Sequence, residues 1–195
     1  MKPKLLITLG CSWTEGIGIY DTKLDPITNK TIYSIDIDKI HKLGWPNRVG
    51  KKLGFDKVIN LGEGKGSHSS QVKKFYEYIK NQNFGDYDVL LIFLMTDPIR
   101  ISIYKNGGIK SYSMSDIENP LMKSYVNELG DTTWDCILEQ KFYIDVLTSM
   151  CMDKNIDLIL TSWNETYTNF RKIHDTNHHL FRHHNPITPP IKNNY

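Results

Sequence analysis

The stretch LLITLGCSWTEG, residues 5–16, passes from an apolar run to a serine flanked by glycines. A short apolar run without polar alternation is typical of a parallel strand covered on both faces. In an open parallel sheet, ligands bind beyond the carboxyl ends of the strands. Ser12 would lie at that end, where it either caps a following helix or is presented for chemistry as a nucleophile.

Three further apolar runs, at residues 57–61, 89–95 and 156–160, predict three more strands. Helical spacing separates them: one helix begins near Pro46, one follows Ser67, and one covers about residues 133–153. We expect the second helix to bury Val72, Phe75, Tyr76 and Ile79, and the third to bury Trp134, Ile137, Leu138, Phe142, Val146, Leu147 and Met150. Strands that alternate with helices predict an α/β fold, a three-layer α/β/α domain with a doubly wound parallel sheet.

The chain has 195 residues, which suits a single domain over residues 1–195. Two polar stretches, at about residues 20–42 and 105–131, interrupt the alternation, and we expect both to be insertions near the carboxyl ends of the strands. The tail from His174 is rich in histidine and proline and loses periodicity. One interpretation of that tail is an incomplete C-terminal end of the domain.

Charge and cysteine content restrict the partners and the compartment. Lysine plus arginine number 24 and aspartate plus glutamate 22, without a basic block, so we expect no nucleic-acid partner. The N-terminal apolar run is too short for a signal peptide or a membrane helix, so we expect no membrane association and synthesis in the cytoplasm. The 3 cysteines form no disulfide or metal-ligand pattern, and we predict no metal site.

The residues that follow each predicted strand define a candidate site at one edge of the sheet. Ser12 follows the first strand, residues 62–68 (GEGKGSH) follow the second, and Thr96, Asp97 and Arg100 follow the third. The glycine-rich run matches neither a phosphate-binding P-loop nor a dinucleotide fingerprint, and residues 10–14 lack the final glycine of a G-x-S-x-G elbow. A serine beside glycine N–H groups suits acyl transfer, because those donors stabilise the oxyanion of the tetrahedral intermediate.

These stretches resemble the blocks of the SGNH (GDSL-type) hydrolase family, especially its phage and environmental branch. Residues 10–16, GCSWTEG, resemble the first block, G-D-S-x-T-x-G, with cysteine in place of aspartate. Residues 58–67, which contain Asn60 and the glycines that follow it, resemble the second block. Thr96 takes the place of the asparagine in the third block. Asp175 and His178 have the D-x-x-H spacing of the last block, with His179 in place of the proline.

The resemblance implies a flavodoxin-like SGNH hydrolase fold and a serine esterase that needs no cofactor. Ser12 would be the nucleophile, His178 the base and Asp175 the residue that orients it, unless the last block lies beyond a truncated end. Gly64 or Gly66, with Thr96, would complete the oxyanion hole, and Arg100 would contact substrate. The implied substrate is a small acyl ester, most plausibly an O-acetyl group on a carbohydrate. The phage-like branch also admits association with a virion.

The same sequence features also allow other functions for the chain and other roles for single residues. A catalytically degenerate member would bind glycan through the same residues without hydrolysis, and a structural virion component is a third class. Trp13, Tyr20 and Trp163 either stack on a sugar ring or belong to the core. Arg100 either binds a substrate carboxylate or phosphate, or pairs with Asp97 or Glu63. The histidine-rich tail is better explained as polar surface than as a zinc site.

Overall fold

The computed structural model describes residues 1–16, 21–24, 31–34, 37–96, 100–105, 108–112, 118–121, 123–124 and 132–162. Its elements, in chain order, are β1 (Lys4–Gly10), α1 (Ser12–Glu15), β2 (Asp21–Leu24), β3 (Thr31–Ser34), α2 (Ile37–Leu43), α3 (Trp45–Leu53), β4 (Lys57–Asn60), α4 (His68–Ile79), β5 (Asp88–Met95), β6 (Ile101–Lys105), β7 (Gly108–Tyr112), α6 (Thr132–Asp153) and β8 (Asp157–Ser162). No helix among these residues is long and apolar enough to cross a membrane.

The four predicted strands form one parallel sheet in the order β4-β1-β5-β8. Counted along the chain, this order is 2-1-3-4, which is how flavodoxin-like doubly wound sheets begin. β1 and β5 pair over nearly their whole lengths, from Lys4 opposite Asp88 to Gly10 opposite Leu94. Both strands are largely buried on both faces, as central strands of a covered parallel sheet must be.

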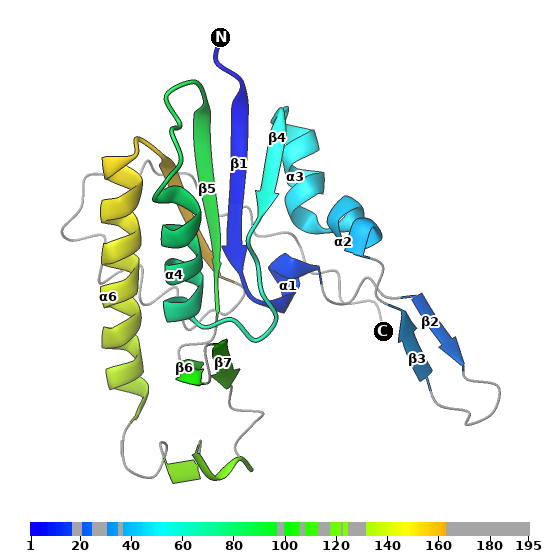
Figure 1. Ribbon diagram of the computed structural model, residues 1–195, viewed down its shortest axis with the longest axis vertical. Coiled ribbons are helices and arrows are strands. Elements are labelled where there is room, and N and C mark those ends of the chain that lie inside the picture. The colour runs from blue at the N-terminus through cyan, green and yellow to red at the C-terminus, as the bar shows by residue number, and fades with distance from the viewer. Residues whose placement is uncertain are drawn as a thin grey trace.

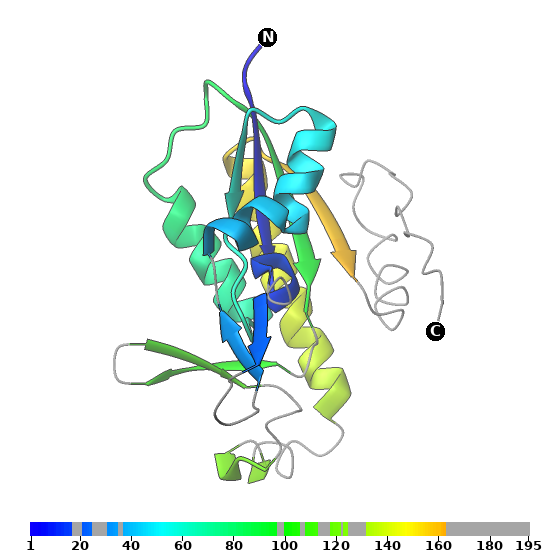
Figure 2. The same ribbon diagram turned by 90° about the vertical axis from the view of Figure 1, so that its right-hand side faces the viewer.

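Helices cover both faces of this sheet, so the fold is the three-layer α/β/α architecture that the sequence predicts (Figure 1). α4 and α6 pack together on one face, and the core there contains Phe75, Leu91, Phe93 and Leu147. α3 lies on the opposite face, where Gly50 of that helix approaches Val58 and Leu6. The view turned by 90° shows the same strands between the two helical layers (Figure 2).

Two of the expected helix faces need correction. Tyr76 of α4 is 52% exposed, although Val72, Phe75 and Ile79 are buried as predicted. On α6, Leu138 and Phe142 are also exposed, whereas Leu147 is buried and Val146 and Met150 pack against the core as predicted. Ile144, Cys151 and Gln140, which were not predicted, are buried as well. The side chains of Trp134 and Ile137 lie outside the described part of the structure. The spacing of apolar residues misled the prediction because α6 carries them on more than one side, so periodicity alone does not identify the buried face.

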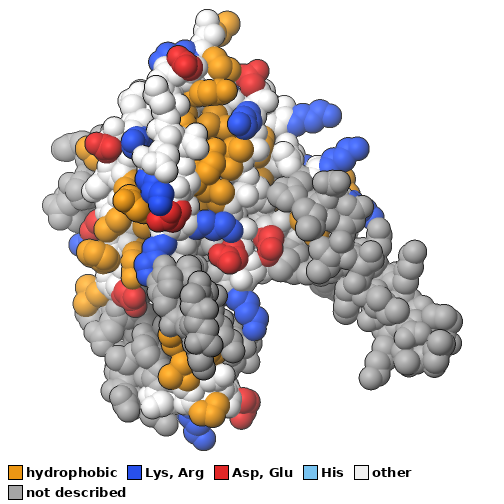
Figure 3. Space-filling model, in the orientation of Figure 1, with side chains coloured by type: hydrophobic (Ala, Val, Ile, Leu, Met, Phe, Trp, Pro, Cys, Tyr) orange, Lys and Arg blue, Asp and Glu red, His pale blue; other side chains and the backbone are white. Residues whose placement is uncertain are grey.

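Two antiparallel hairpins that sequence periodicity did not predict lie in or next to the polar stretches. β2 pairs with β3 within residues 20–42. β6 ends where the second stretch begins and pairs with β7 inside it, from Ile101 opposite Tyr112 to Lys105 opposite Gly108. β6 and β7 lie beyond the carboxyl ends of β1 and β5, beside the first turn of α4, whereas the β2–β3 hairpin extends away from the sheet (Figures 1 and 2). Charged side chains of both signs are interspersed over the face seen in Figure 3.

Candidate functional site

β1 ends at Gly10 and the chain turns at once into the single helical turn α1. Ser12 is the first residue of α1, and Cys11 holds the cap position with an extended backbone and no side-chain cap bond. The interpretation of Ser12 as the helix cap is therefore wrong. Ser12 remains partly exposed while Cys11 and Thr14 on either side of it are buried. The turn thus leaves Ser12 accessible while it buries Cys11 and Thr14.

Glycine is required where this turn meets the sheet and the next loop. Gly10 has a φ of +150°, and a Cβ there would collide with Thr14 Oγ1 and lie 2.9 Å from the carbonyl oxygen of Leu94. Gly62, in the loop after β4, packs against α1 so closely that a Cβ would lie 2.6 Å from the Glu15 nitrogen. Gly10 thus lets the turn after β1 pack closely against the end of β5, and Gly62 lets the loop after β4 pack closely against α1.

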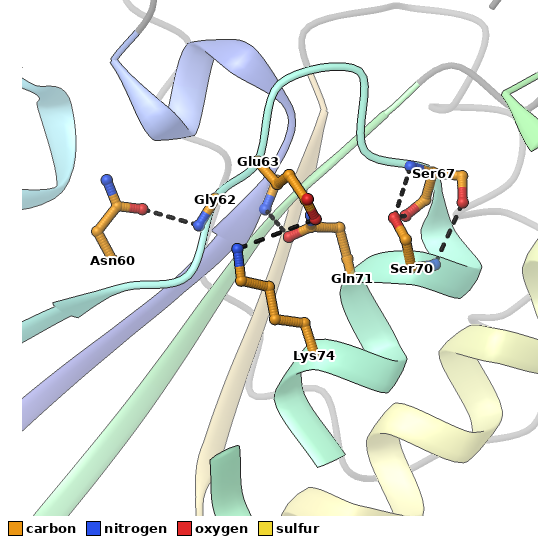
Figure 4. A network of polar contacts seen from close by, with 8 residues as sticks. Asn60, Gly62, Glu63, Ser67, Ser70, Gln71 and Lys74 are labelled. Carbon is orange, nitrogen blue, oxygen red and sulfur yellow. Dashed lines mark hydrogen bonds and ion pairs between the residues drawn. The ribbon is translucent and has the colours of Figure 1, made fainter. Parts of the chain in front are cut away.

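Asn60, the last residue of β4, ties this turn to the neighbouring loop. Its Nδ2 donates to the carbonyl oxygen of Thr14 at 2.7 Å, and its Oδ1 accepts from the Gly62 N–H at 2.9 Å. The Thr8 hydroxyl of β1 lies 3.3 Å from the same Oδ1. One amide group therefore fixes β1, α1 and the loop after β4 relative to one another, and Figure 4 shows its contact with Gly62.

Gly10 is held from a second direction by Glu63 and by Gln71, a residue that the sequence pattern did not indicate. The Gly10 N–H donates to Oε1 of Gln71, a fully buried side chain of α4, at 3.0 Å. The Gly10 carbonyl oxygen accepts from the Glu63 N–H at 3.0 Å, and Glu63 also faces Lys74 at 3.9 Å (Figure 4). The backbone just before Ser12 is consequently fixed by both α4 and the loop after β4.

The structure distinguishes the two glycines proposed for the oxyanion hole. The Gly66 N–H donates to the Glu63 carbonyl oxygen at 3.0 Å, and Gly66 is buried. Gly64 is partly exposed, and among the described residues its N–H has no hydrogen-bond acceptor. Lys65 between them has a φ of +59°, a left-handed conformation that sharpens the turn. Of the two, Gly64 is the one whose N–H remains for a ligand.

The first turn of α4 carries a cluster of buried hydroxyl groups. Ser67 and Ser70 form a capping box, in which each side chain accepts from the backbone N–H of the other (Figure 4). Ser67 Oγ also lies 2.9 Å from Ser69 Oγ and 2.5 Å from Ser102 Oγ of β6. These contacts attach the β6–β7 hairpin to the end of α4 that faces the site.

Behind this cluster lies His68, a buried histidine to which the sequence pattern assigned no role. The Nδ1 atom of His68 is 3.4 Å from Thr96 Oγ1, and its ring contacts Phe93 edge-on. Burial, with the nearby Arg100 charge in second place, lowers the pKa of His68 to about 3, so the ring is neutral at pH 7. Its position after the glycine-rich loop was the available signal, because helix starts beside ligand-binding loops commonly carry polar residues.

Thr96 follows β5 directly and is fully buried, with its hydroxyl beside His68. Arg100 is half-buried, and its Nε and Nη1 atoms are buried without a hydrogen-bond partner among the described residues. Trp13, next to Ser12, is 69% exposed and so does not belong to the core. Asp175, His178, Asp97, Tyr20 and Trp163 lie outside the described residues, as does the histidine-rich tail.

Comparison with known proteins gives a structural likeness only. No protein-family model matches the chain, and no curated protein does. Among solved structures, it is similar to AlinE4, an SGNH-hydrolase family esterase, with a TM-score of 0.43 and 12% sequence identity. The match covers 82% of this chain and 59% of the esterase chain, and a mutant of the same esterase, with one aspartate replaced by alanine, matches equally.

Proposed function

We propose that this protein is a serine esterase of the SGNH type, with Ser12 as the nucleophile. One observation carries the proposal: the carboxyl end of a central strand delivers Ser12 on a turn that Asn60, Glu63 and Gln71 brace from two sides. A nucleophile must be held within a few tenths of an ångström of its productive position, and bracing of this kind supplies that rigidity. A serine with only a structural role would not need it.

In this mechanism Ser12 Oγ attacks the ester carbonyl carbon while His178 takes its proton. Asp175 orients His178, which then protonates the leaving alcohol, and water releases the acyl group from Ser12 by the reverse steps. The backbone N–H groups of Ser12 and Gly64, with Thr96, would hold the oxyanion. Gly64 is preferred to Gly66 because the Gly66 N–H is already bonded to Glu63.

The exposed Trp13 supports a carbohydrate ester as substrate. An indole that is 69% exposed costs free energy in water unless a ligand covers it, and its flat face suits the apolar face of a sugar ring. Trp13 directly follows Ser12, so a sugar stacked on it would place its substituents near the nucleophile. We therefore propose O-acetylated carbohydrate as the substrate class.

A second candidate function is glycan binding without hydrolysis, and the position of Thr96 favours it. The hydroxyl group of Thr96 is fully buried and lies 3.4 Å from His68 Nδ1, so it already has a partner within the protein. A degenerate oxyanion hole would leave Trp13 and the surrounding loops as a binding surface.

Hydrolysis of p-nitrophenyl acetate by the full chain separates these two functions. We expect Ser12→Ala and His178→Ala each to lower kcat/KM by about 10³-fold or more, as loss of a triad member does. The exposed Ser149→Ala on α6 is the matched control and should retain full activity. Trp13→Ala should raise KM for an acetylated saccharide without changing kcat for p-nitrophenyl acetate. Equal activity of Ser12→Ala and wild type would leave binding as the function.

A further inference from the structure

Arg100 is a partly buried cation, and two of its three side-chain nitrogens have no hydrogen-bond partner in the described part of the protein. Its Nε and Nη1 atoms are buried without a partner, and no ion pair joins it to a carboxylate among the described residues. A buried donor without an acceptor is unfavourable, and a charged one more so. Glu63, one of the acids considered for Arg100, instead faces Lys74.

The position of Arg100 connects it to the candidate site. β5 lies beside β1, with Leu94 opposite Gly10, so the segment that follows β5 begins at the same edge as the Ser12 turn. Two residues after Arg100, Ser102 contacts Ser67 at the start of α4. Arg100 therefore belongs to the segment that enters the β6–β7 hairpin, and its charge is felt by His68 in the first turn of α4.

Arg100 lies near enough to His68 to act on its charge, and that ring is neutral because it is buried, so it supplies no balancing negative charge. No ion pair of Arg100 is found among the residues that the structure describes. Arg100 as a whole is only half-buried. Planar guanidinium donors bind a carboxylate through two parallel hydrogen bonds, a geometry that lysine cannot reproduce.

We propose that Arg100 binds the carboxylate of an acidic sugar, so that the substrate is an acetylated glycan of the uronic-acid type. This inference rests on the proposed function for its ester, but the binding event does not depend on turnover. The acetate released by hydrolysis also carries a carboxylate that Arg100 could bind. Acetate and a uronic acid differ because only the uronic acid has a sugar ring that contributes to affinity.

Calorimetric titration of the Ser12→Ala protein tests the proposal without hydrolysis. Glucuronate should bind, glucose should bind at least tenfold more weakly, and acetate should also bind more weakly than glucuronate. Adding Arg100→Met should weaken glucuronate binding about 10- to 100-fold, the range for a lost hydrogen bond to a charged group. The exposed Arg48→Met on α3 is the matched control and should leave binding unchanged.

A second substitution at Arg100 separates its charge from its hydrogen-bonding geometry. Arg100→Lys retains the charge without the paired donors and should lose about tenfold in glucuronate affinity, which provides the comparison if Arg100→Met does not fold. Equal binding of glucuronate and glucose, equal binding of acetate and glucuronate, or unchanged affinity in Arg100→Lys would each overturn the proposal. Absence of hydrolysis by wild type, with Arg100-dependent glucuronate binding intact, would refute only the esterase function.

Discussion

Asn60 shows how one side chain can determine the position of a turn to which it is not adjacent in sequence. Its amide contacts Thr14, Gly62 and Thr8, which belong to three different segments. It needs a donor and an acceptor on separate atoms for this, which among the short side chains only asparagine provides at neutral pH. The position of Ser12, the proposed nucleophile, therefore depends on an amide that has no role of its own in the proposed reaction.

Asn60→Asp should show how far the Ser12 turn depends on the hydrogen bond that the Asn60 amide donates. The carboxylate keeps the acceptor for Gly62 N–H but faces the Thr14 carbonyl oxygen without a proton to donate. We expect a loss of about 1–3 kcal/mol in the free energy of unfolding and a fall in Ser12-dependent hydrolysis. Urea denaturation and the acetate assay measure the two effects. The control is Asn83→Asp, an exposed residue whose Oδ1 likewise accepts a backbone N–H, from Gly85. Equal stability of both variants would contradict the prediction.

For single residues, the sequence allowed predictions where the role of a residue depends on its immediate neighbours in the chain. The order of glycine and serine after β1 indicated a presented nucleophile, and the exposed Trp13 was one of two stated alternatives. Gln71 and His68 were not predicted, because their roles depend on partners in β1 and after β5 that only the fold brings near. The roles of Asp175 and His178 stay predictions.

The elements differ in how strongly their sequences specify them. The four parallel strands have continuous apolar runs, and each lies within two residues of its predicted bounds. β2, β3, β6 and β7 were missed because their short sequences mix polar and apolar residues without a clean alternation. Tertiary contacts, such as that between Ser102 and Ser67, then contribute to holding a hairpin that its own sequence defines weakly.

Ser102→Ala tests this attachment of the β6–β7 hairpin. The variant removes the 2.5 Å hydroxyl contact with Ser67, and a bond of this kind contributes about 1 kcal/mol. We expect amide hydrogen exchange in β6 and β7 to accelerate about fivefold, with exchange in β1 and β5 unchanged. Ser149→Ala, which removes a hydroxyl bonded to the Asp145 carbonyl oxygen on α6, should leave the hairpin as it is. Unaltered exchange in the hairpin of Ser102→Ala would show that other contacts hold it.

For the whole molecule, burial of His68 makes stability depend on pH. The folded-state pKa of His68 is about 3, against an ordinary value of 6.5, because burial and then Arg100 disfavour the charged ring. Below pH 6.5 the unfolded chain therefore binds a proton that the folded protein does not. The stabilisation from this residue is complete above pH 6.5 and is lost as the pH falls toward 3.

His68→Gln should reduce this dependence. From pH 7 to pH 5, wild type should lose about 2 kcal/mol more of its unfolding free energy than the variant does, since glutamine does not titrate. Urea denaturation at the two pH values measures the difference, and carboxylates common to both proteins cancel in the comparison. If both proteins lost the same amount of stability, His68 would have to be protonated or exposed in the folded state.

The bracing of the Ser12 turn also has a consequence for folding during synthesis. The turn leaves the ribosome before the residues that brace it, because Asn60 follows Thr14 by 46 residues and Gln71 follows Gly10 by 61. β5, which pairs with β1 along nearly its whole length, is made later still. Contacts that distant in sequence form slowly, and although β4 can pair with one edge of β1 earlier, the other edge stays unpaired until the chain has grown past residue 95. A chaperone that shields this strand would raise the yield of the folded protein.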